Sequence, residues 1–220
     1  MPVTWRVPEL HARLLARFGP QGWWPARGEV EMMVGAVLVQ NTAWQQAAKV
    51  VAALDERGLL DFAALRGLPE EQGWELLRPA GFFRQKMRRL QALARFFAAF
   101  DDSPARFFAL PGAEQRLALL GIHGIGPETA DSILCYGARL PLFVVDAYTW
   151  RLWERLGWAA RSTPYAEMQR RVQEAMPAEA AVLGELHALI VALAKAHCLS
   201  RPRCQGCPVD FCPYPSGGVP

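Results

Sequence analysis

The stretch that decides the fold is residues 117–146, LALLGIHGIGPETADSILCYGARLPLFVVD. Its centre, Gly-Ile-Gly at residues 124–126, follows an apolar run and leads directly into Pro127. Proline suits the first position of a helix, because the N–H that it lacks would have no partner there, and glycine gives a tight turn its freedom. We therefore predict two helices joined by this turn, the second running from Pro127 to about Tyr136 and closed by Gly137.

Two features of this stretch suggest chemistry. A turn of this kind at a helix N-terminus exposes backbone N–H groups at the positive end of the helix dipole, which suits a phosphate. Twenty residues after Gly126, an apolar Phe-Val-Val run delivers Asp146 to the start of another helix. Each feature alone has an ordinary explanation, since such turns often join packed helices and an aspartate before a helix is usually its N-cap.

Taken together, LxGIHGIGPETAD and VVDAYTWR resemble the helix-hairpin-helix and Gly/Pro-Asp signature of the endonuclease III superfamily of DNA glycosylases. The resemblance implies an all-α, two-lobed fold with a C-terminal [4Fe–4S] loop. It also implies that the hairpin grips the DNA backbone and that Asp146 is the catalytic carboxylate. The expected domains are residues 23–138, with six helices and the hairpin, and residues 1–22 plus 139–220, a second helical domain with the iron–sulfur loop.

Composition narrows the class of protein. The chain has 220 residues, of which 52% are hydrophobic, and its net charge of +3 is too small to argue for nucleic acid by itself. No apolar run reaches the roughly 18 residues of a membrane span. The N-terminus lacks the apolar core of a secretion signal. We therefore expect a cytoplasmic protein with no membrane partner, and the resemblance implies a nucleoid-associated monomer that acts on double-stranded DNA from which a damaged base is flipped.

Apolar residues at helical spacing, broken by Gly and Pro, predict helices throughout and no strand. The helix at 29–40 is almost entirely apolar and is expected to be central. His187 lies among apolar residues, so we expect a core histidine and no ligand. The other expected helices are 8–18, one starting at Trp44, two short ones within 55–78, 82–97, 105–110, 112–120, 147–156, 164–176 and 178–197.

Three tryptophans are candidates for a base pocket. Trp23 and Trp24 are adjacent, and successive helical side chains diverge by about 100°, so we expect one to be a buried anchor and the other to line a pocket. WWP followed by QNTAW resembles the branch that excises 3-methyladenine, in which aromatics at the Trp24 and Trp44 positions sandwich the damaged base. Core packing is the alternative for each tryptophan alone.

Glu128 bears on the reaction type. Bifunctional members of the family carry a lysine at this position, which forms a Schiff base and cleaves the strand. A carboxylate cannot form a Schiff base, so Glu128 implies a monofunctional glycosylase and completes the expected pocket. Two alternatives stay open. One is an endonuclease III-type lyase for oxidised pyrimidines that uses Lys86 or Lys195. The other is a non-catalytic cluster protein that binds DNA or senses redox state.

The expected DNA surface combines the hairpin with the helix at 82–97. Arg84, Lys86, Arg88 and Arg89 crowd the first turns of that helix, where the dipole disfavours cations, so a phosphate ligand accounts for them better than solvation does. In the family, the residue at the Phe82 position wedges into the duplex and a Gln at the Gln40 position lies beside the DNA. The full set expected to contact DNA is Gln40, Phe82, Gly124, Ile125, Gly126 and Thr129.

Four of the five cysteines lie close together near the C-terminus, as CLSRPRCQGCPVDFC, and Cys135 is mid-helix. Such clustering indicates a metal site, and its chemistry suits zinc or an iron–sulfur cluster equally. The resemblance implies [4Fe–4S]. The spacing C-x5-C-x2-C-x4-C is one residue shorter in each outer gap than in the family. Arg201 and Arg203 in the first gap suggest a phosphate-binding surface. The expected ligands are Cys198, Cys204, Cys207 and Cys212.

Overall fold

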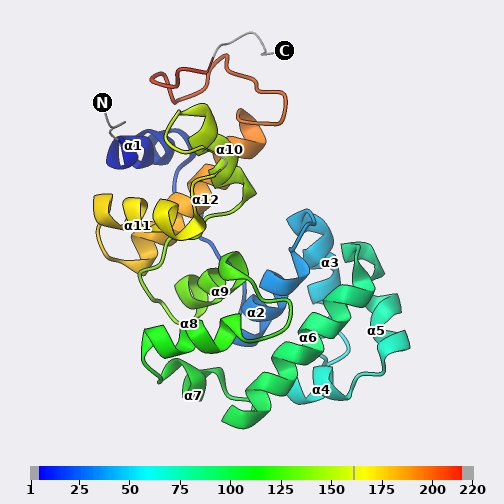
Figure 1. Cartoon of the computed structure of the whole chain (residues 1–220). Coiled ribbons are helices and arrows are strands. Elements are labelled where there is room, and N and C mark those ends of the chain that lie inside the picture. Colours follow the sequence, from blue (N-terminus) through cyan, green and yellow to red (C-terminus); the bar gives the residue numbers. More distant parts are fainter. Residues whose placement is uncertain (1–4, 161, 215–220) are drawn as a thin grey trace. The chain divides into compact units, whose positions relative to one another are not determined.

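A computed structural model describes residues 5–160 and 162–214, and these form helices and no strand, which confirms the predicted all-α class (Figure 1). Apart from the hairpin's second helix, the helices for which the sequence predicted both ends begin and end within three residues of the prediction. The α-helices are α1 (Val7–Phe18), α2 (Glu29–Leu38), α3 (Trp44–Asp55), α4 (Phe62–Gly67), α5 (Glu70–Leu77), α6 (Phe83–Phe97), α7 (Pro104–Phe108), α8 (Gly112–Leu120), α9 (Pro127–Ser132), α10 (Ala147–Arg155), α11 (Tyr165–Ala175) and α12 (Ala180–Ala196). Two 3-10 turns, η1 (Arg78–Ala80) and η2 (Ala98–Phe100), and a π-helical segment, η3 (Ile133–Gly137), complete the set.

The chain divides into two compact units. The hairpin unit is Trp24–Ala138, and the second unit is Met1–Trp23 with Arg139–Pro220. The hairpin unit holds eight α-helices, α2 to α9, where the resemblance implied six; the eight include the short helices α4, α5 and α7, which the sequence pattern predicted.

The hairpin unit is built around α2 and α6. Seven of the ten residues of α2 are buried, and the helix contacts α3, α6, α9 and η3, as its apolar composition predicted. The amphipathic α6 packs on α4 and α5 (Figure 1). Phe62 and Phe97 stack with ring centroids 4.3 Å apart, and Phe107 meets Phe97 edge to face. Each such pair contributes about 0.5–1.5 kcal/mol beyond the apolar area that it buries.

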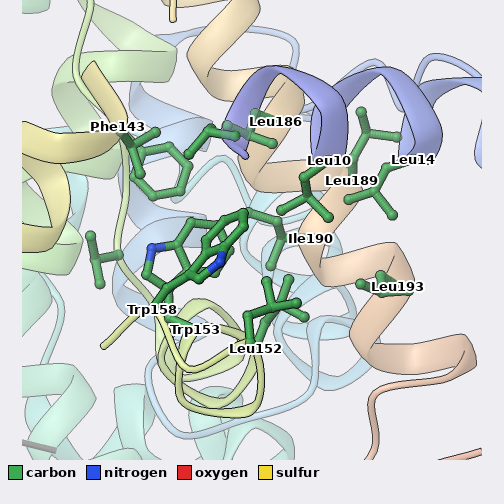
Figure 2. Close-up of a cluster of buried hydrophobic side chains, with 14 of the residues drawn as sticks. Leu10, Leu14, Phe143, Leu152, Trp153, Trp158, Leu186, Leu189, Ile190 and Leu193 are labelled. Carbon is green, nitrogen blue, oxygen red and sulfur yellow. The ribbon is translucent and has the colours of Figure 1, made fainter. Parts of the chain in front are cut away.

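The second unit is built around α12, which contacts α1 and α10. Its core is shown in Figure 2, where Trp153 and Trp158 of the α10 region meet the leucines of α1 and α12. Trp153 is fully buried and lies nearly parallel to Phe143, with ring centroids 6.3 Å apart. Phe143 comes from the apolar run before Asp146, so this run anchors the start of α10 in the core.

Among the described residues, no single helix is both long and apolar enough to cross a membrane. Only α11 and α12 taken together pass that test, as a pair bent by 118° at the break between them.

The hairpin turn lies between Leu120 at the end of α8 and Pro127 at the start of α9. Gly124 has φ +83°, in the left-handed region, and a Cβ there would overlap the side chain of Arg89. Gly126 is extended, with φ −93° and ψ 179°, and a Cβ there would meet nothing within 4 Å. Gly124 is therefore the position of the turn that requires glycine, whereas a side chain at Gly126 would contact no other part of the protein.

The second helix of the hairpin does not end as predicted. It is α-helical only to Ser132 and continues as the π-helical η3, and the left-handed residue beyond it is Arg139, with φ 58°. Gly137 has another reason to be small. A Cβ there would lie 2.8 Å from Cε of Met32 and 3.0 Å from Cζ of Phe108. Gly137 is needed for packing and does not supply a left-handed cap.

Candidate functional site

Asp146 is the N-cap of α10. Its Oδ1 accepts hydrogen bonds from the backbone N–H of Thr149 at 2.7 Å and from the Thr149 hydroxyl at 2.8 Å. The residue is only 8% exposed. The sequence-based prediction that Asp146 is an N-cap is therefore confirmed. The capping bonds use Oδ1 and leave Oδ2 for another partner.

That partner is a residue that the sequence analysis assigned only to the core. His187 of α12 is buried, and its Nε2 lies 3.4 Å from Oδ2 of Asp146. Burial raises the pKa of Asp146, but the hydrogen bond and charge of His187 and the two bonds from Thr149 outweigh burial, so the pKa lies below its ordinary value. The carboxylate is therefore ionised at neutral pH. A histidine on an apolar helix gave no sequence signal that it would face Asp146.

The two adjacent tryptophans belong to different units. Trp23 lies in the same unit as Asp146, with its ring centroid 5.6 Å from that of His187 and 6.0 Å from Nζ of Lys195. Trp24 lies in the hairpin unit and contacts Trp44. Of the predicted pocket residues, the structure thus brings Trp24 and Trp44 together and groups Trp23 with His187 instead.

Trp24 and Trp44 do not form a parallel slot. Their rings meet edge to face, with centroids 5.4 Å apart and an angle of 86°. Tyr136, which the sequence analysis did not single out, adds a third ring at 5.6 Å from Trp24. Gly35 of α2 makes room for this cluster, because a Cβ there would lie 3.2 Å from Nε1 of Trp24. A base could lie between the two indoles only after one of them rotates.

Gln40 is tied to the hairpin. Its Nε2 donates to the carbonyl of Gly124 at 3.1 Å and to the hydroxyl of Thr129 at 2.8 Å, and its Oε1 accepts from Arg89 at 2.6 Å. The network joins the end of α2 to the turn and to α6. The amide of Gln40 therefore holds the hairpin in this structure, and the side chain must release these bonds before it can contact DNA.

The predicted cationic cluster on α6 is wrong for Lys86, and Arg89 is only half-buried. Lys86 is fully buried, and its Nζ donates to the carbonyl of Ala80 at 2.6 Å. Burial, followed by the charge of Arg89, lowers the pKa of Lys86 to about 8. Arg89 is held by Gln40. Arg84 and Arg88 are the two exposed members, and the guanidinium of Arg84 also lies 4.8 Å from the Trp74 ring.

Phe82 is the residue of this region best placed to meet a ligand. It is left-handed, with φ 47°, and 62% of its surface is exposed just before α6. Gly126 and Glu128 are exposed, whereas the side chains of Ile125 and Thr129 are buried. Contacts of Ile125 or Thr129 with DNA would therefore have to use backbone groups.

All four C-terminal cysteines line one cavity of about 290 Å³ in the second unit. A guanidinium N–H of Arg155 donates to Sγ of Cys198 at 3.0 Å, and Nε of Arg151 donates to the Cys198 carbonyl at 2.7 Å. Elsewhere in the loop, Phe211 stacks on Trp158. The loop is thus fixed to α10 at its first cysteine and to the core near its last.

Four thiols line this cavity, and such a donor set suits either an iron–sulfur cluster or a zinc ion. In the described part of the chain, no three His, Cys, Asp or Glu side chains are arranged to hold a metal ion.

Comparisons with known proteins agree with this geometry. Residues 34–178 match the HhH-GPD superfamily of base excision DNA repair proteins. A Methanocaldococcus jannaschii protein, named as a candidate DNA repair glycosylase, is 35% identical over 209 residues, which is 94% of this chain and 95% of the relative.

Two solved structures show the same fold. The H. pylori 3-methyladenine DNA glycosylase bound to 1,N6-ethenoadenine is 26% identical, with a TM-score of 0.74, over 86% of this chain and 95% of that one. A trapped endonuclease III–DNA covalent intermediate is 20% identical, with a TM-score of 0.81, over 95% of each chain. The chain therefore belongs to the HhH-GPD superfamily of base excision DNA repair proteins, and its place in that superfamily is among the DNA glycosylases.

Proposed function

We propose that this glycosylase is monofunctional and hydrolyses the N-glycosidic bond of alkylated purines such as 3-methyladenine in double-stranded DNA, leaving an abasic site. The observation that carries the proposal is Glu128, which is exposed on the first turn of α9, at the position where bifunctional relatives carry a lysine. A carboxylate there cannot form a Schiff base with the sugar.

Asp146 supplies the chemistry in this proposal. The glycosidic bond of an N3- or N7-alkylated purine is already weak because the base carries positive charge. The enzyme then needs mainly an ionised carboxylate that stabilises oxocarbenium-like charge on the sugar and orients the attacking water. The lowered pKa of Asp146 and its two fixed oxygens support this role.

The aromatic cluster of Trp24, Trp44 and Tyr136 supports a cationic base as the substrate. A base that has left the stack can be held on an aromatic face. A positively charged purine gains a cation–π attraction of about 0.5–2 kcal/mol that a neutral base does not. Glu128 would favour the same cation if it borders the pocket. Because the two indoles are in contact, we expect one ring to rotate when the base enters.

DNA contacts complete the proposal. Gly126 and the exposed Arg84 and Arg88 would meet backbone phosphates, which fix position without reading sequence. Phe82 would fill the gap that the flipped base leaves. The four cysteines would hold a [4Fe–4S] cluster with a structural role. We expect the protein to act as a monomer.

A second candidate is the endonuclease III reaction on oxidised pyrimidines. It is favoured by relatives named endonuclease III, such as that of Thermotoga maritima, 25% identical over 80% of this chain and 78% of that one. This reaction needs an amine. Lys86 is buried against a carbonyl, so of the two lysines considered only the exposed Lys195 is accessible.

The test is mass spectrometry of bases released from methylated duplex DNA, with a thymine glycol duplex and borohydride trapping in parallel. We expect 3-methyladenine, no release from the thymine glycol duplex and no trapped adduct. Asp146→Asn should abolish release while binding to abasic DNA and the thermal midpoint are retained, because Asn is also a good N-cap. Strand cleavage at thymine glycol with a trapped adduct would assign the second candidate. Near wild-type release by Asp146→Asn would make Asp146 only a cap.

A further inference from the structure

His187 of α12 contacts Asp146 at the start of α10, and this contact goes beyond what a histidine that only fills the core would make. His187 is 4% exposed and its ring packs beside Trp23, with ring centroids 5.6 Å apart and planes tilted by 57°. A phenylalanine could make the same kind of ring contact with Trp23. What the imidazole adds is an N–H within reach of Oδ2 of Asp146, 3.4 Å away.

We propose that His187 is a positioning residue for catalysis, which holds Oδ2 of Asp146 while Thr149 holds Oδ1. The inference rests on the proposed catalytic role of Asp146. All four residues involved, Trp23, Asp146, Thr149 and His187, lie in the same unit.

Contacts at both oxygens fix the plane of the carboxylate. Thr149 alone holds one oxygen through two donors, and rotation about that point would leave Oδ2 free to turn. The contact of Oδ2 with Nε2 of His187, at 3.4 Å, restricts this rotation. Because Trp23 packs on the imidazole, the donor itself is held in place. A reacting group that is fixed before the substrate arrives needs no reorganisation when charge develops on the sugar.

The same contact keeps Asp146 charged. Burial is the largest single influence on the pKa of Asp146 and raises it, and His187 makes the largest of the contributions that lower it. On the same helix as His187, Lys195 places its Nζ 6.0 Å from the centroid of the Trp23 ring. Glu185, on the same helix as His187, instead accepts a hydrogen bond from the backbone N–H of Gln21.

Two substitutions separate positioning from packing. His187→Phe keeps the ring and its contact with Trp23 but removes the N–H. His187→Gln places an amide N–H close to where Nε2 lies. Each variant is assayed for the single-turnover rate of 3-methyladenine release from about pH 5 to pH 8, for binding to abasic-analogue DNA and for its thermal midpoint. Asp146→Asn is measured in parallel.

We expect His187→Phe to slow release at least about 10-fold at neutral pH, since a misplacement of about 1 Å can cost about 100-fold. The acidic limb of its pH–rate profile should move to higher pH, because Asp146 then protonates more easily. His187→Gln should restore most of the rate and the limb. Binding of abasic DNA should stay unchanged in both.

A wild-type rate and an unmoved limb in His187→Phe would overturn the inference. It would also be overturned if both variants lost rate only in proportion to a lowered thermal midpoint, because that pattern reports packing. Either result leaves the proposed function standing as long as Asp146→Asn is inactive. An active Asp146→Asn would instead overturn the proposed function.

Discussion

Gly124→Ala and Gly126→Ala form a matched pair two residues apart in the hairpin. An alanine at position 124 would adopt φ +83°, which costs an L-residue about 1–2 kcal/mol. Its Cβ would also lie 2.7 Å from Nε and 2.8 Å from Cδ of Arg89, so Arg89 must move and weaken its bond to Gln40. A hydrogen bond to a charged group contributes about 1.5–3 kcal/mol, which we reduce to about 1 because Arg89 is partly exposed.

The expected loss for Gly124→Ala is therefore about 2–3 kcal/mol in the free energy of unfolding. Gly126→Ala should change the free energy of unfolding by less than about 0.5 kcal/mol, or raise it slightly. The φ of −93° at this position suits alanine, and the added Cβ would meet nothing within 4 Å. Alanine also reduces the conformational freedom of the unfolded chain, which favours the folded state. Urea unfolding followed by tryptophan fluorescence measures both values, with the slope checked for constancy.

Gly126→Ala should reduce DNA affinity more than Gly124→Ala does, the reverse of their order of effect on stability. Gly126 is exposed, so a side chain there should hinder the approach of a phosphate and weaken binding to damaged and undamaged duplex alike. Fluorescence anisotropy with both duplexes measures this. If the two variants unfold within about 0.5 kcal/mol of each other, the assignment of strain to Gly124 is refuted. If Gly126→Ala binds both duplexes as the wild type does, the DNA surface lies elsewhere.

Three other outcomes are expected. The pKa of Lys86 is lowered from 10.5 to about 8, so between these pH values the unfolded chain binds one more proton than the folded chain. The free energy of unfolding should therefore rise with pH across this window in the wild type but not in Lys86→Met. An equal dependence on pH in both proteins, measured by urea titrations, would contradict this. Phe82→Ala should slow release from fully paired duplex more than from duplex with a mismatch at the lesion. Leu117→Ala, at the other exposed large apolar side chain among the described residues, should change neither rate. The purified protein should be brown and contain iron and sulfide, and Cys204→Ser should lose the colour while Cys135→Ser keeps it; a colourless protein with one zinc would contradict the cluster.

Local signals in the sequence were sufficient for the helices and for the position of the turn. Helical spacing of apolar residues placed α1 to α12, because an amphipathic period reflects one buried face and needs no knowledge of the partner. Proline at the first position of α9 and aspartate before α10 marked two helix starts, since both act through groups within their own first turn. The superfamily was indicated by the resemblance of the two segments that contain these features to its known signature.

The partners of individual side chains could not be predicted in this way. Nothing in the local sequence distinguishes Lys86, which is buried, from the exposed Arg88, and the period that places both on α6 does not show which neighbours cover them. Similarly, Gly124 and Gly126 look equivalent in a Gly-Ile-Gly turn, but only Gly124 is left-handed. Arg89, 35 residues earlier in the chain, also packs against Gly124 and not against Gly126, which no local pattern shows.

In the candidate site, too, the sequence determined some of the contacts and the tertiary structure decided the others. The sequence determined that Asp146 would begin a helix, and so it determined one of the carboxylate's two attachments. Only the tertiary structure decided the other, because α12 brings His187 to Asp146 from 41 residues away. It also decided that Trp23 would pack on His187 while Trp24 meets Trp44. Hydrogen bonds and ring contacts between distant residues depend on how helices pack, and packing is a property of the whole fold.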